Sequence, residues 1–357
     1  MSEKVEVVKF HLKRFKIESE YLKKLFDINE LPLCNTEVEI EIKGIHTAVI
    51  NALRRVLTDE MTGKCLRVPQ DGYDMEKSTE PFSIAQFVNQ RISLVPLRQQ
   101  ISDNVIKNVR LDLDITNEGN TDMIVYTGDL VTSQGELREI IFNPTFQLAV
   151  LQPGKRIVIK GIYISLGKGR DDGAYIVARH AAYKHLDLEQ FDKSETHQVG
   201  GAAAEQSGYK KSSMLSEPKH HLLTATIPAT TSNPNDVKNI FADACDVIIE
   251  RLRFIVSLAS SNVDAAHRIG TQLNIIELSS GLFECELRVP GETNTIGNLI
   301  VKYTHVLYPK ISYVCHIVPP NQNILILKIR HDGDITKLLM QVANHCIEIF
   351  KTIRNNI

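Results

Sequence analysis

The chain has 357 residues, with 41 Lys and Arg against 43 Asp and Glu, so its formal net charge is −2. This length is sufficient for two or three domains and a large apolar core. The balanced charge gives no basic excess of the kind that marks a nucleic-acid-binding chain. The first ten residues lack an apolar signal-peptide core, and no apolar run approaches the roughly 20 residues of a membrane span. We therefore expect neither a signal peptide nor a membrane helix.

The six cysteines stand singly, at least 30 residues apart, at positions 34, 65, 245, 285, 315 and 346. Neither a disulfide framework nor a zinc ribbon has this spacing. We expect reduced thiols that pack as small apolar side chains, and no metal or other cofactor.

The first predicted unit is a strand, a turn and a helix. Residues 37–43 alternate Glu or Lys with Val and Ile, which predicts a strand with one buried face. Gly44 ends this alternation, and residues 45–61 change to the helical spacing seen at Ile45, Val49 and Leu53. The change of period at a glycine predicts a strand–turn–helix unit.

The next segment is predicted to be mainly β. Alternation over residues 109–115 and a second apolar run at 123–126 flank a turn, and together they predict a hairpin. A Pro-Gly turn at 151–155 leads into a predicted strand over 157–165. Residues 194–216 are small and polar, and we predict that they form a mobile linker.

The remainder is predicted to contain two long amphipathic helices, each opened by an aspartate suited to an N-cap, at Asp236 and Asp334. Between them, residues 273–289 predict two strands, 294–308 a helix, and 311–329 a hairpin across a Pro-Pro-Asn-Gln turn. The end of the chain therefore has the order ββαββα.

The strand–turn–helix unit occurs twice, 247 residues apart and without a gap. The matching residues are Glu37, Glu39, Gly44 and Asn51 in the first copy and Glu284, Glu286, Gly291 and Asn298 in the second. A unit used twice predicts an α+β fold with two related half-domains that pair face to face, as a dimer built inside one chain.

The spacing of the helices locates an insertion. From Asn51 to Asp236 is 185 residues, whereas from Asn298 to Asp334 is 36, so the first half carries 149 extra residues. We predict that residues 1–64 and 217–262 form the first half-domain, that 65–216 form an inserted mainly-β domain, and that 263–357 form the second half-domain.

The residues that could carry chemistry are few. Arg54 and Arg55 on the first helix are compatible with a solvated face or with a forked contact to a partner's carboxylate. The glycine-rich loop 167–173 lacks the spacing of a P-loop, which favours a charged turn for a partner over a nucleotide site. His180 and His185 have the wrong offset to share a helix face, and no cysteine stands near them. We therefore predict no catalytic residue.

Several of these motifs resemble the α-like subunits of multisubunit RNA polymerases. The run Asn51-Ala-Leu-Arg-Arg-Val56 resembles a helix of the third-largest subunit, of its archaeal counterpart and of the bacterial alpha amino-terminal domain. Residues 87–97, 151–155 and 166–169 resemble the family's Ala-His-Arg-Leu-Gly-Leu-Ile-Pro-Leu pattern, Leu-Arg-Pro-Gly-Gln turn and glycine-lysine loop. Residues 292–299 resemble the acidic lead-in and His-Thr-Leu-Gly-Asn-Leu motif of the eleventh subunit and its archaeal counterpart.

The chain also departs from the family pattern. Gln90-Arg91-Ile92-Ser93 replaces His-Arg-x-Gly, and Asn294 stands where the family has histidine. The cysteine cluster that binds zinc or an iron–sulfur centre in many relatives is missing, in agreement with the prediction of no metal. Fusion of both partners in one chain is similar to the fused polymerase subunits of African swine fever virus and related large DNA viruses.

The resemblance implies a non-catalytic platform for polymerase assembly. It implies an internal dimer seam and a surface for the second-largest subunit, while the largest subunit and small assembly subunits are further partners. We assign to the seam Leu53, Ile240, Phe241, Ile248, Leu252, Leu339, Ile347 and Phe350, and to the large-subunit surface Arg54, Arg55, Arg91, Lys168 and Asp171. Little nucleic-acid contact, no membrane contact and no homo-oligomer are expected. A viral protein would act in the host cytoplasm and virion, and a cellular one in the nucleus.

Two other classes of function are left open by the sequence. A direct nucleic-acid-binding factor would bind with a steep dependence on salt. An enzyme that used the glycine-lysine loop on a phosphorylated substrate would show thermal stabilisation by nucleotide that depends on Lys168.

Overall fold

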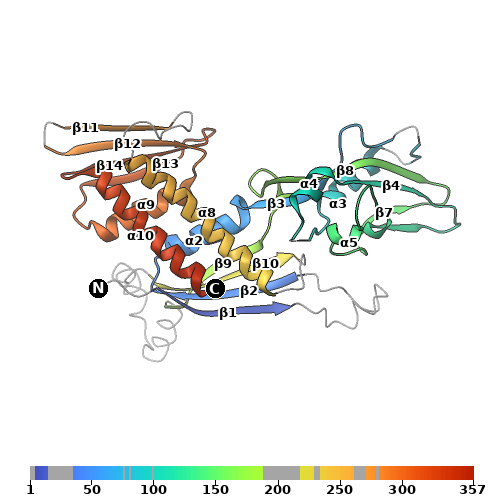
Figure 1. The fold of residues 1–357 in the computed structure, drawn as a ribbon, viewed down its shortest axis with the longest axis horizontal. Coiled ribbons are helices and arrows are strands. Elements are labelled where there is room, and N and C mark those ends of the chain that lie inside the picture. Colours follow the sequence, from blue (N-terminus) through green and yellow to red (C-terminus); the bar gives the residue numbers. More distant parts are fainter. Residues whose placement is uncertain are drawn as a thin grey trace, which may run out of the picture.

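The computed structural model describes residues 5–14, 35–74, 77–79, 82–98, 100–187, 218–228, 234–260, 271–278 and 281–357. Helices and antiparallel sheets together make a mixed α+β fold, as predicted (Figure 1). The predicted linker at 194–216 and the connection between residues 260 and 271 lie outside the described residues.

The first sheet contains four antiparallel strands in the order β1-β2-β10-β9. These are β1 (Glu6–Arg14), β2 (Asn35–Lys43), β10 (His220–Pro228) and β9 (Arg179–His185). Val38, Ile40 and Ile42 of β2 are buried because successive side chains of a strand point to opposite faces. The helices packed on this sheet are α2 (Thr47–Arg55), which continues as the π-helix η1 (Val56–Glu60), and α8 (Pro234–Ser260).

The second sheet repeats this arrangement with the order β11-β12-β14-β13. Its strands are β11 (Gln272–Glu277), β12 (Phe283–Pro290), β14 (Ile324–His331) and β13 (Tyr313–Ile317), and its helices are α9 (Asn294–Leu307) and α10 (Ile335–Asn356). The predicted ββαββα order and the 311–329 hairpin are confirmed.

The duplicated turns have the same backbone conformation. Gly44 has φ 74° and Gly291 has φ 78°, in the left-handed region that favours glycine. Three residues beyond each glycine a helix begins, α2 at Thr47 and α9 at Asn294. The repeat in the sequence is therefore a repeat of strand, turn and helix in space.

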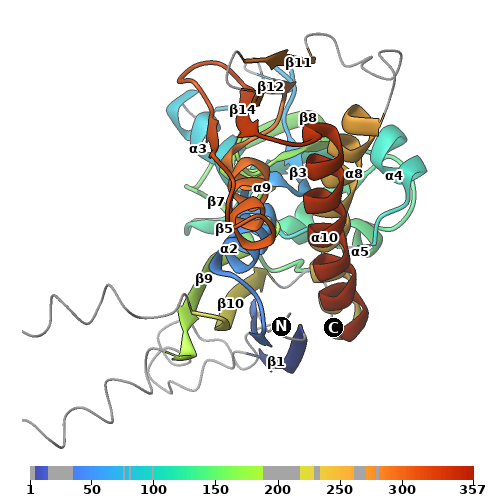
Figure 2. The ribbon, with the colours of Figure 1, turned by 90° about the vertical axis from the view of Figure 1, so that its left-hand side faces the viewer.

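A single hydrophobic core includes residues from both sheets and from all four helices. Helices α8 and α10 lie side by side within it (Figures 1 and 2). They are antiparallel, because Arg354 pairs with Asp246 at 2.8 Å, and Lys238 donates to the Ile357 carbonyl oxygen at 2.8 Å.

A second hydrophobic core lies in the part of the chain between these elements. Its larger sheet has the order β3-β8-β4-β6, and its smaller sheet pairs β5 with β7. The strands are β3 (Thr62–Arg67), β8 (Arg156–Lys168), β4 (Arg110–Thr116), β6 (Val131–Thr132), β5 (Met123–Tyr126) and β7 (Gln147–Leu151). The helices are α3 (Phe82–Ser93), α4 (Asp103–Asn108), α5 (Leu137–Ile140) and the short 3-10 turns η2 (Thr127–Asp129) and η3 (Gly173–Tyr175).

The predicted hairpin of residues 109–126 is wrong. Both strands exist, but β4 pairs with β8 and β6, whereas β5 pairs with β7. The turn that follows β4 is attached to β7. The Asn117 amide donates to the carbonyl oxygen of Leu151 in β7 and to that of Thr121 in the turn, each at 2.8 Å. Asn117 therefore directs the chain from one sheet into the other.

Helix boundaries differ in detail from the predictions. Asp334 caps α10 by accepting from the N–H groups of Thr336 and Lys337, as predicted. Helix α8 begins at Pro234, so Asp236 lies in its first turn and is not the N-cap; its carboxylate accepts from the Gln100 amide at 2.9 Å. The helix predicted over 45–61 begins at Thr47 and changes to π geometry at Val56.

Candidate partner interface

Helix α2 ends at the two predicted interface arginines and changes geometry there. Its N-cap is His46, whose Nδ1 accepts from the Ala48 N–H at 2.9 Å. After Arg55 the chain forms one π turn, and the Thr58 hydroxyl donates to the carbonyl oxygens of Arg54 and Arg55 at 3.2 and 3.3 Å. Such π turns are rare and occur frequently at functional sites. The Arg54 Nε donates to Asn51 Oδ1 at 3.1 Å.

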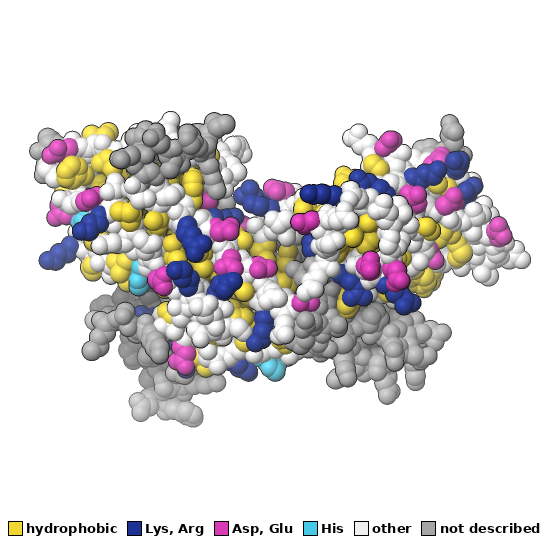
Figure 3. Space-filling view, in the orientation of Figure 1, with side chains coloured by type: hydrophobic (Ala, Val, Ile, Leu, Met, Phe, Trp, Pro, Cys, Tyr) yellow, Lys and Arg dark blue, Asp and Glu magenta, His cyan; other side chains and the backbone are white. Residues whose placement is uncertain are grey.

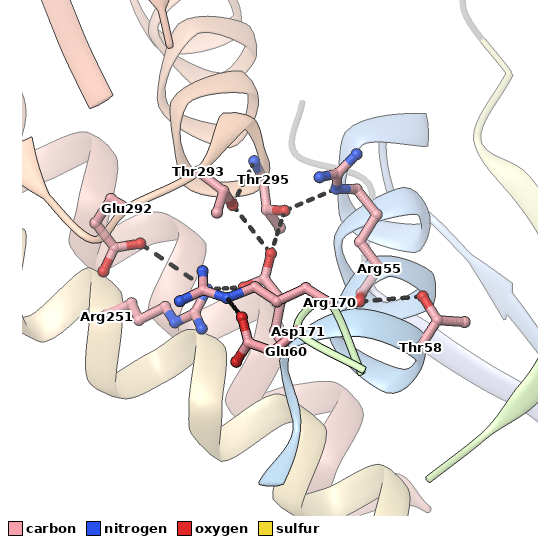
Figure 4. A network of polar contacts seen from close by, with 9 residues as sticks. All are labelled: Arg55, Thr58, Glu60, Arg170, Asp171, Arg251, Glu292, Thr293 and Thr295. Carbon is pink, nitrogen blue, oxygen red and sulfur yellow. Dashed lines mark hydrogen bonds and ion pairs between the residues drawn. The ribbon is translucent and has the colours of Figure 1, made fainter. Parts of the chain in front are cut away.

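The π turn directs Glu60 into the interior, where only 2% of the residue is exposed. Its Oε1 accepts from the hydroxyls of Thr293 and Thr295, each at 3.0 Å, and its Oε2 pairs with Arg251 of α8 (Figure 4). The Thr295 hydroxyl also accepts from Arg55 Nε at 2.9 Å. This network joins the end of α2, the middle of α8 and the start of α9.

The surroundings of Glu60 suit a buried negative charge. Burying a carboxylate costs several kcal/mol unless a cation and hydrogen bonds compensate it. Here Arg251 supplies the cation, two threonines supply hydroxyl donors, and the N-terminal end of α9 adds the positive end of a helix dipole. Glu292, also buried, lies 3.9 Å from Arg251, so the guanidinium is placed between two carboxylates.

The glycine-rich loop 167–173 packs against η1. The Arg170 N–H donates to the Asp59 carbonyl oxygen at 3.0 Å, and those of Asp171 and Asp172 donate to the Lys168 carbonyl oxygen at 2.9 and 3.3 Å. Three successive N–H groups are therefore used inside the protein. A phosphate cradle needs such groups to face the ligand, so this geometry argues against a nucleotide site.

The same loop is anchored to β3 through Arg67. The Arg67 guanidinium pairs with Asp172 at 2.5 Å and lies over the Tyr175 ring, 5.0 Å from its centre. The Tyr175 hydroxyl is 2.8 Å from Ser165 Oγ. Hydrogen bonds from the Ala174 N–H and the Arg67 guanidinium hold the pKa of the Asp172 carboxyl below its usual value. The loop is therefore anchored at two points, to η1 through Arg170 and to β3 through Asp172.

The contact between the loop and η1 has no room for a side chain at Gly169. A Cβ added there would lie 2.2 Å from the Thr58 carbonyl oxygen, and backbone must move to relieve the overlap. We expect Gly169→Ala to destabilise the protein by about 1–3 kcal/mol, the usual cost of overpacking. Thermal unfolding followed by circular dichroism measures the shift. Gly173→Ala is the control, because its Cβ would meet only the Ile176 side chain at 3.9 Å; equal shifts for both variants would contradict the prediction.

The structure brings four of the five predicted large-subunit contacts to one region. Arg54 and Arg55 belong to the last turn of α2, directly before η1. Lys168 and Asp171 belong to the loop that packs on η1. Both arginines and Lys168 are half-buried, whereas Asp171 is exposed and pairs with Arg170 at 3.6 Å.

Arg91 lies elsewhere, on α3. Its Nε donates to the Gln147 carbonyl oxygen at 2.7 Å, and its guanidinium lies between the rings of Phe87 and Phe146, 5.7 and 5.3 Å from their centres. Within the described ranges, no hydrogen bond, ion pair or ring contact links Arg91 to the other four residues. Its observed contacts join α3 to β7.

The eight residues assigned to the internal seam are all buried, and all belong to the core shared by the two sheets. Leu53 comes from α2, four of the others from α8 and three from α10. Phe241 also meets the Phe10 ring edge-on, at 5.8 Å between centres. Their role as a dimer seam stays a prediction.

The residues of the buried network were not found from the sequence. Glu60, Arg251, Thr293 and Thr295 come from three segments that no local pattern connects. One signal was present: Glu60 stands four residues after Val56 and three after Leu57, both fully buried, so a charge occupied a core position of the predicted helix.

The described cysteines, at positions 65, 245, 285, 315 and 346, are free thiols. Burial raises the pKa of both the Cys245 and Cys285 thiols to about 12. Among the described residues, no three His, Cys, Asp or Glu side chains are grouped so as to hold a metal ion. In the same part of the chain, no helix is both long and apolar enough to cross a membrane.

Comparison with known proteins gives close relatives over almost the whole chain. The DNA-directed RNA polymerase RPB3-11 homologue of African swine fever virus, isolate Tick/Malawi/Lil 20-1/1983, is 33% identical over 344 residues, covering 94% of this chain and 91% of the relative. The homologue from isolate Pig/Kenya/KEN-50/1950 is 34% identical over 344 residues, with the same coverage of both proteins. No family model matches the chain.

An archaeal relative matches a smaller part. The DNA-directed RNA polymerase subunit Rpo3 of Pyrococcus furiosus is 25% identical over 162 residues, covering 44% of this chain and 58% of the relative. The resemblance to fused α-like polymerase subunits is thereby confirmed. On its length, its motifs and its identity to the viral proteins, the chain belongs to the family of RPB3-11 homologues of DNA-directed RNA polymerase.

Proposed function

We propose that this chain is a non-catalytic assembly subunit of a multisubunit DNA-directed RNA polymerase, built as a dimer inside one polypeptide. The main support is the core shared by two sheets of identical strand order, with α8 antiparallel to α10. Fusion in one polypeptide would keep the two halves at a high effective concentration.

We further propose a division into domains that follows the sheets. The first half-domain would contain β1, β2, α2, β9, β10 and α8, and the second would contain residues 271–357. The inserted domain would run from β3 to β8, because residues 62–67 pair with β8. This division differs from the one expected from the sequence at β9, which lies within 65–216 yet pairs with β10 of the first sheet.

The second-largest subunit is assigned to the region of Arg54, Arg55, Lys168 and Asp171. Arg54 and Arg55 are half-buried in the last turn of α2, and Lys168 is half-buried in a loop anchored by Arg67, so a partner would meet groups that are already ordered. Arg91 lies on α3, where its guanidinium contacts the rings of Phe87 and Phe146. It would therefore form a separate contact with the same subunit. The largest subunit and small assembly subunits are proposed as further partners.

The face shown in Figure 3 fits protein partners better than nucleic acid. On the face shown in Figure 3, basic and acidic side chains are interspersed, and no long basic stripe follows an element. A nucleic-acid site needs such a stripe to neutralise successive phosphates. As a viral polymerase subunit, the protein would act in the host cytoplasm and be packaged in the virion.

Affinity purification from infected cells tests this proposal. The tag belongs at the N-terminus, because the terminal Ile357 carbonyl oxygen accepts from Lys238. We expect two very large proteins to co-purify near one-to-one with the chain, together with RNA-synthesising activity. Recovery of the chain alone would reject the assembly function, although the membership of the family would stand.

A further inference from the structure

Strand β11 forms one edge of the second sheet (Figure 1). Its residues pair with β12 in a continuous register, from Gln272 opposite Arg288 to Glu277 opposite Phe283. Within the described residues, no strand pairs with the other side of β11. An edge strand presents a row of backbone N–H and C=O groups that have no strand partner. The free side of β11 can therefore pair with the backbone of a further extended segment.

The side chains of β11 are apolar on both faces of the sheet. Ile275 lies opposite the buried Cys285, on the side of the hydrophobic core, and 42% of Ile275 is exposed. Ile276 lies opposite Glu284 on the other face, and 63% of Ile276 is exposed. Side chains on adjacent strands contact each other on each face of a sheet. A strand added at the edge would therefore cover both isoleucines.

The equivalent edge of the first sheet is protected against strand addition. Strands β1 and β11 are equivalent because each pairs with a strand of the duplicated unit, β2 or β12. The register of β1 with β2 shifts between Val7 and Lys9, and Lys13 pairs with Glu39 at 2.7 Å. Bulges and exposed lysines are two features that keep edge strands from pairing with other chains. Strand β1 has both features.

Strand β11 has neither feature. Its six residues include no lysine, arginine or proline, and its register with β12 has no shift. The two halves of the chain therefore differ at equivalent edges, since only the edge at β11 lacks these protective features. Addition of a strand to such an edge is a recurring mode of protein recognition.

The size of the edge indicates which kind of polypeptide binds there. A strand of six residues extends about 20 Å, and a sheet is about 10 Å thick, so the edge has an area of about 200 Å². A stable interface between two proteins buries about 1,200–2,000 Å² in total. A second copy joined at this edge alone would form too small an interface for a stable dimer. A segment of a partner that is also bound at other surfaces needs little affinity from the edge itself.

The charges near the edge indicate the composition of the segment. Glu277 is the one ionisable residue among the six of β11, and it is exposed. On β12, Glu284 pairs with Arg330 at 2.5 Å. Glu286 pairs with Lys328 at 3.0 Å. Among the described residues, no ion pair includes Glu277, so a basic residue of the partner would find an uncompensated carboxylate there.

We propose that an extended segment of a partner polypeptide adds to β11 as a fifth strand of the second sheet. The segment has apolar side chains on both faces, against Ile275 and Ile276, and a basic residue near Glu277. A strand pairs with the backbone groups of the edge, whereas a helix packed there would leave them without partners. This inference rests on the proposed function, because the partner is held at other surfaces of the same assembly.

Hydrogen–deuterium exchange of the full chain, isolated and in the purified polymerase, tests this edge. We expect amides of residues 272–277 on the free side of β11 to exchange about tenfold more slowly in the polymerase, because strand pairing protects them. Ile276→Lys places a charge at the edge and should abolish this difference. Val8→Lys is the matched control, since Val8 is 41% exposed on the equivalent strand β1, and it should keep the difference.

A second variant keeps the test valid if Ile276→Lys disturbs folding. Glu277→Lys changes an exposed residue and should also reduce the protection, because it repels the basic residue of the segment. If two very large proteins co-purify but residues 272–277 exchange equally in both samples, the docking edge is rejected and the proposed function stands. Recovery of the chain alone would reject both. A dimer of the isolated chain in sedimentation velocity that Ile276→Lys abolishes would also overturn the proposal, since a second copy would then occupy the edge.

Discussion

Replacement of Glu60 with alanine is expected to lower the free energy of unfolding by about 3–5 kcal/mol, the cost of leaving one partner of a buried ion pair alone. In the variant, Arg251 would lose the nearer of its two carboxylates, since Glu292 lies 3.9 Å away, and the hydroxyls of Thr293 and Thr295 would lose the Glu60 acceptor. The measurement is urea denaturation of the full chain followed by far-UV circular dichroism.

Glu250→Ala is the matched control, since this exposed glutamate precedes Arg251 on α8. We expect it to change stability by less than about 0.5 kcal/mol. A double variant, Glu60→Ala with Arg251→Ala, should cost less than the sum of the two single changes, because each single change already removes the interaction between Glu60 and Arg251. Additive effects, or a Glu60→Ala variant as stable as the control, would show that the pair contributes nothing to the contact between η1 and α8.

The double variant Arg54→Ala with Arg55→Ala is expected to remain folded but to lose the second-largest polymerase subunit. Hydrogen bonds to a charged group contribute about 1.5–3 kcal/mol each, so removal of two arginines should weaken the contact by about 100-fold or more. Pull-down with the tagged chain, quantified against the co-purified subunit, measures the loss. Retention of the subunit at the normal ratio would reject the assignment of these arginines.

Two controls separate a partner contact from a structural effect. Arg253→Ala with Lys310→Ala removes two exposed basic residues that are not part of the assigned surface and should leave the pull-down unchanged. Thr295→Val removes the internal acceptor of Arg55 while keeping both arginines. If Thr295→Val alone loses the subunit, Arg55 acts by positioning α9 and not by contact with the partner.

The two ends of the contact between α2 and α9 have different surroundings. The end at Arg55 and Thr295 is closed by Glu60 and by the loop 167–173, whereas the end at His46 and Lys302 borders a cavity of about 480 Å³. A true homodimer would present two identical ends. In a fused chain the two ends can differ in sequence. Glu60, for example, corresponds to Leu307 in the second copy of the repeat, and each residue can change without the other.

Local patterns in the sequence were sufficient for the duplicated unit and for the elements of the second half. The alternation of residues 37–43, the left-handed glycine at 44 and the helical stripe that follows each depend on neighbours a few residues apart, and the same holds for their repeat at 284–298. Asp334 caps its helix for the same reason, since the bonds it forms reach only two and three residues ahead. The resemblance to the polymerase family also came from such short runs.

What the sequence by itself determined is therefore the duplicated strand–turn–helix unit, the ββαββα order at the end of the chain, the long helices and the family of the chain. Only the tertiary structure decided that β4 and β5 enter different sheets, that β9 returns to the first sheet, and that Arg91 lies apart from Arg54 and Arg55. It alone joined Glu60 to residues 191 to 235 positions away and formed the cavity between Asn51 and Asn298. The physical reason is that strand pairing and buried ion pairs depend on which surfaces meet when the chain folds. Residues far apart in the sequence form these contacts, and local spacing does not indicate which of them will meet.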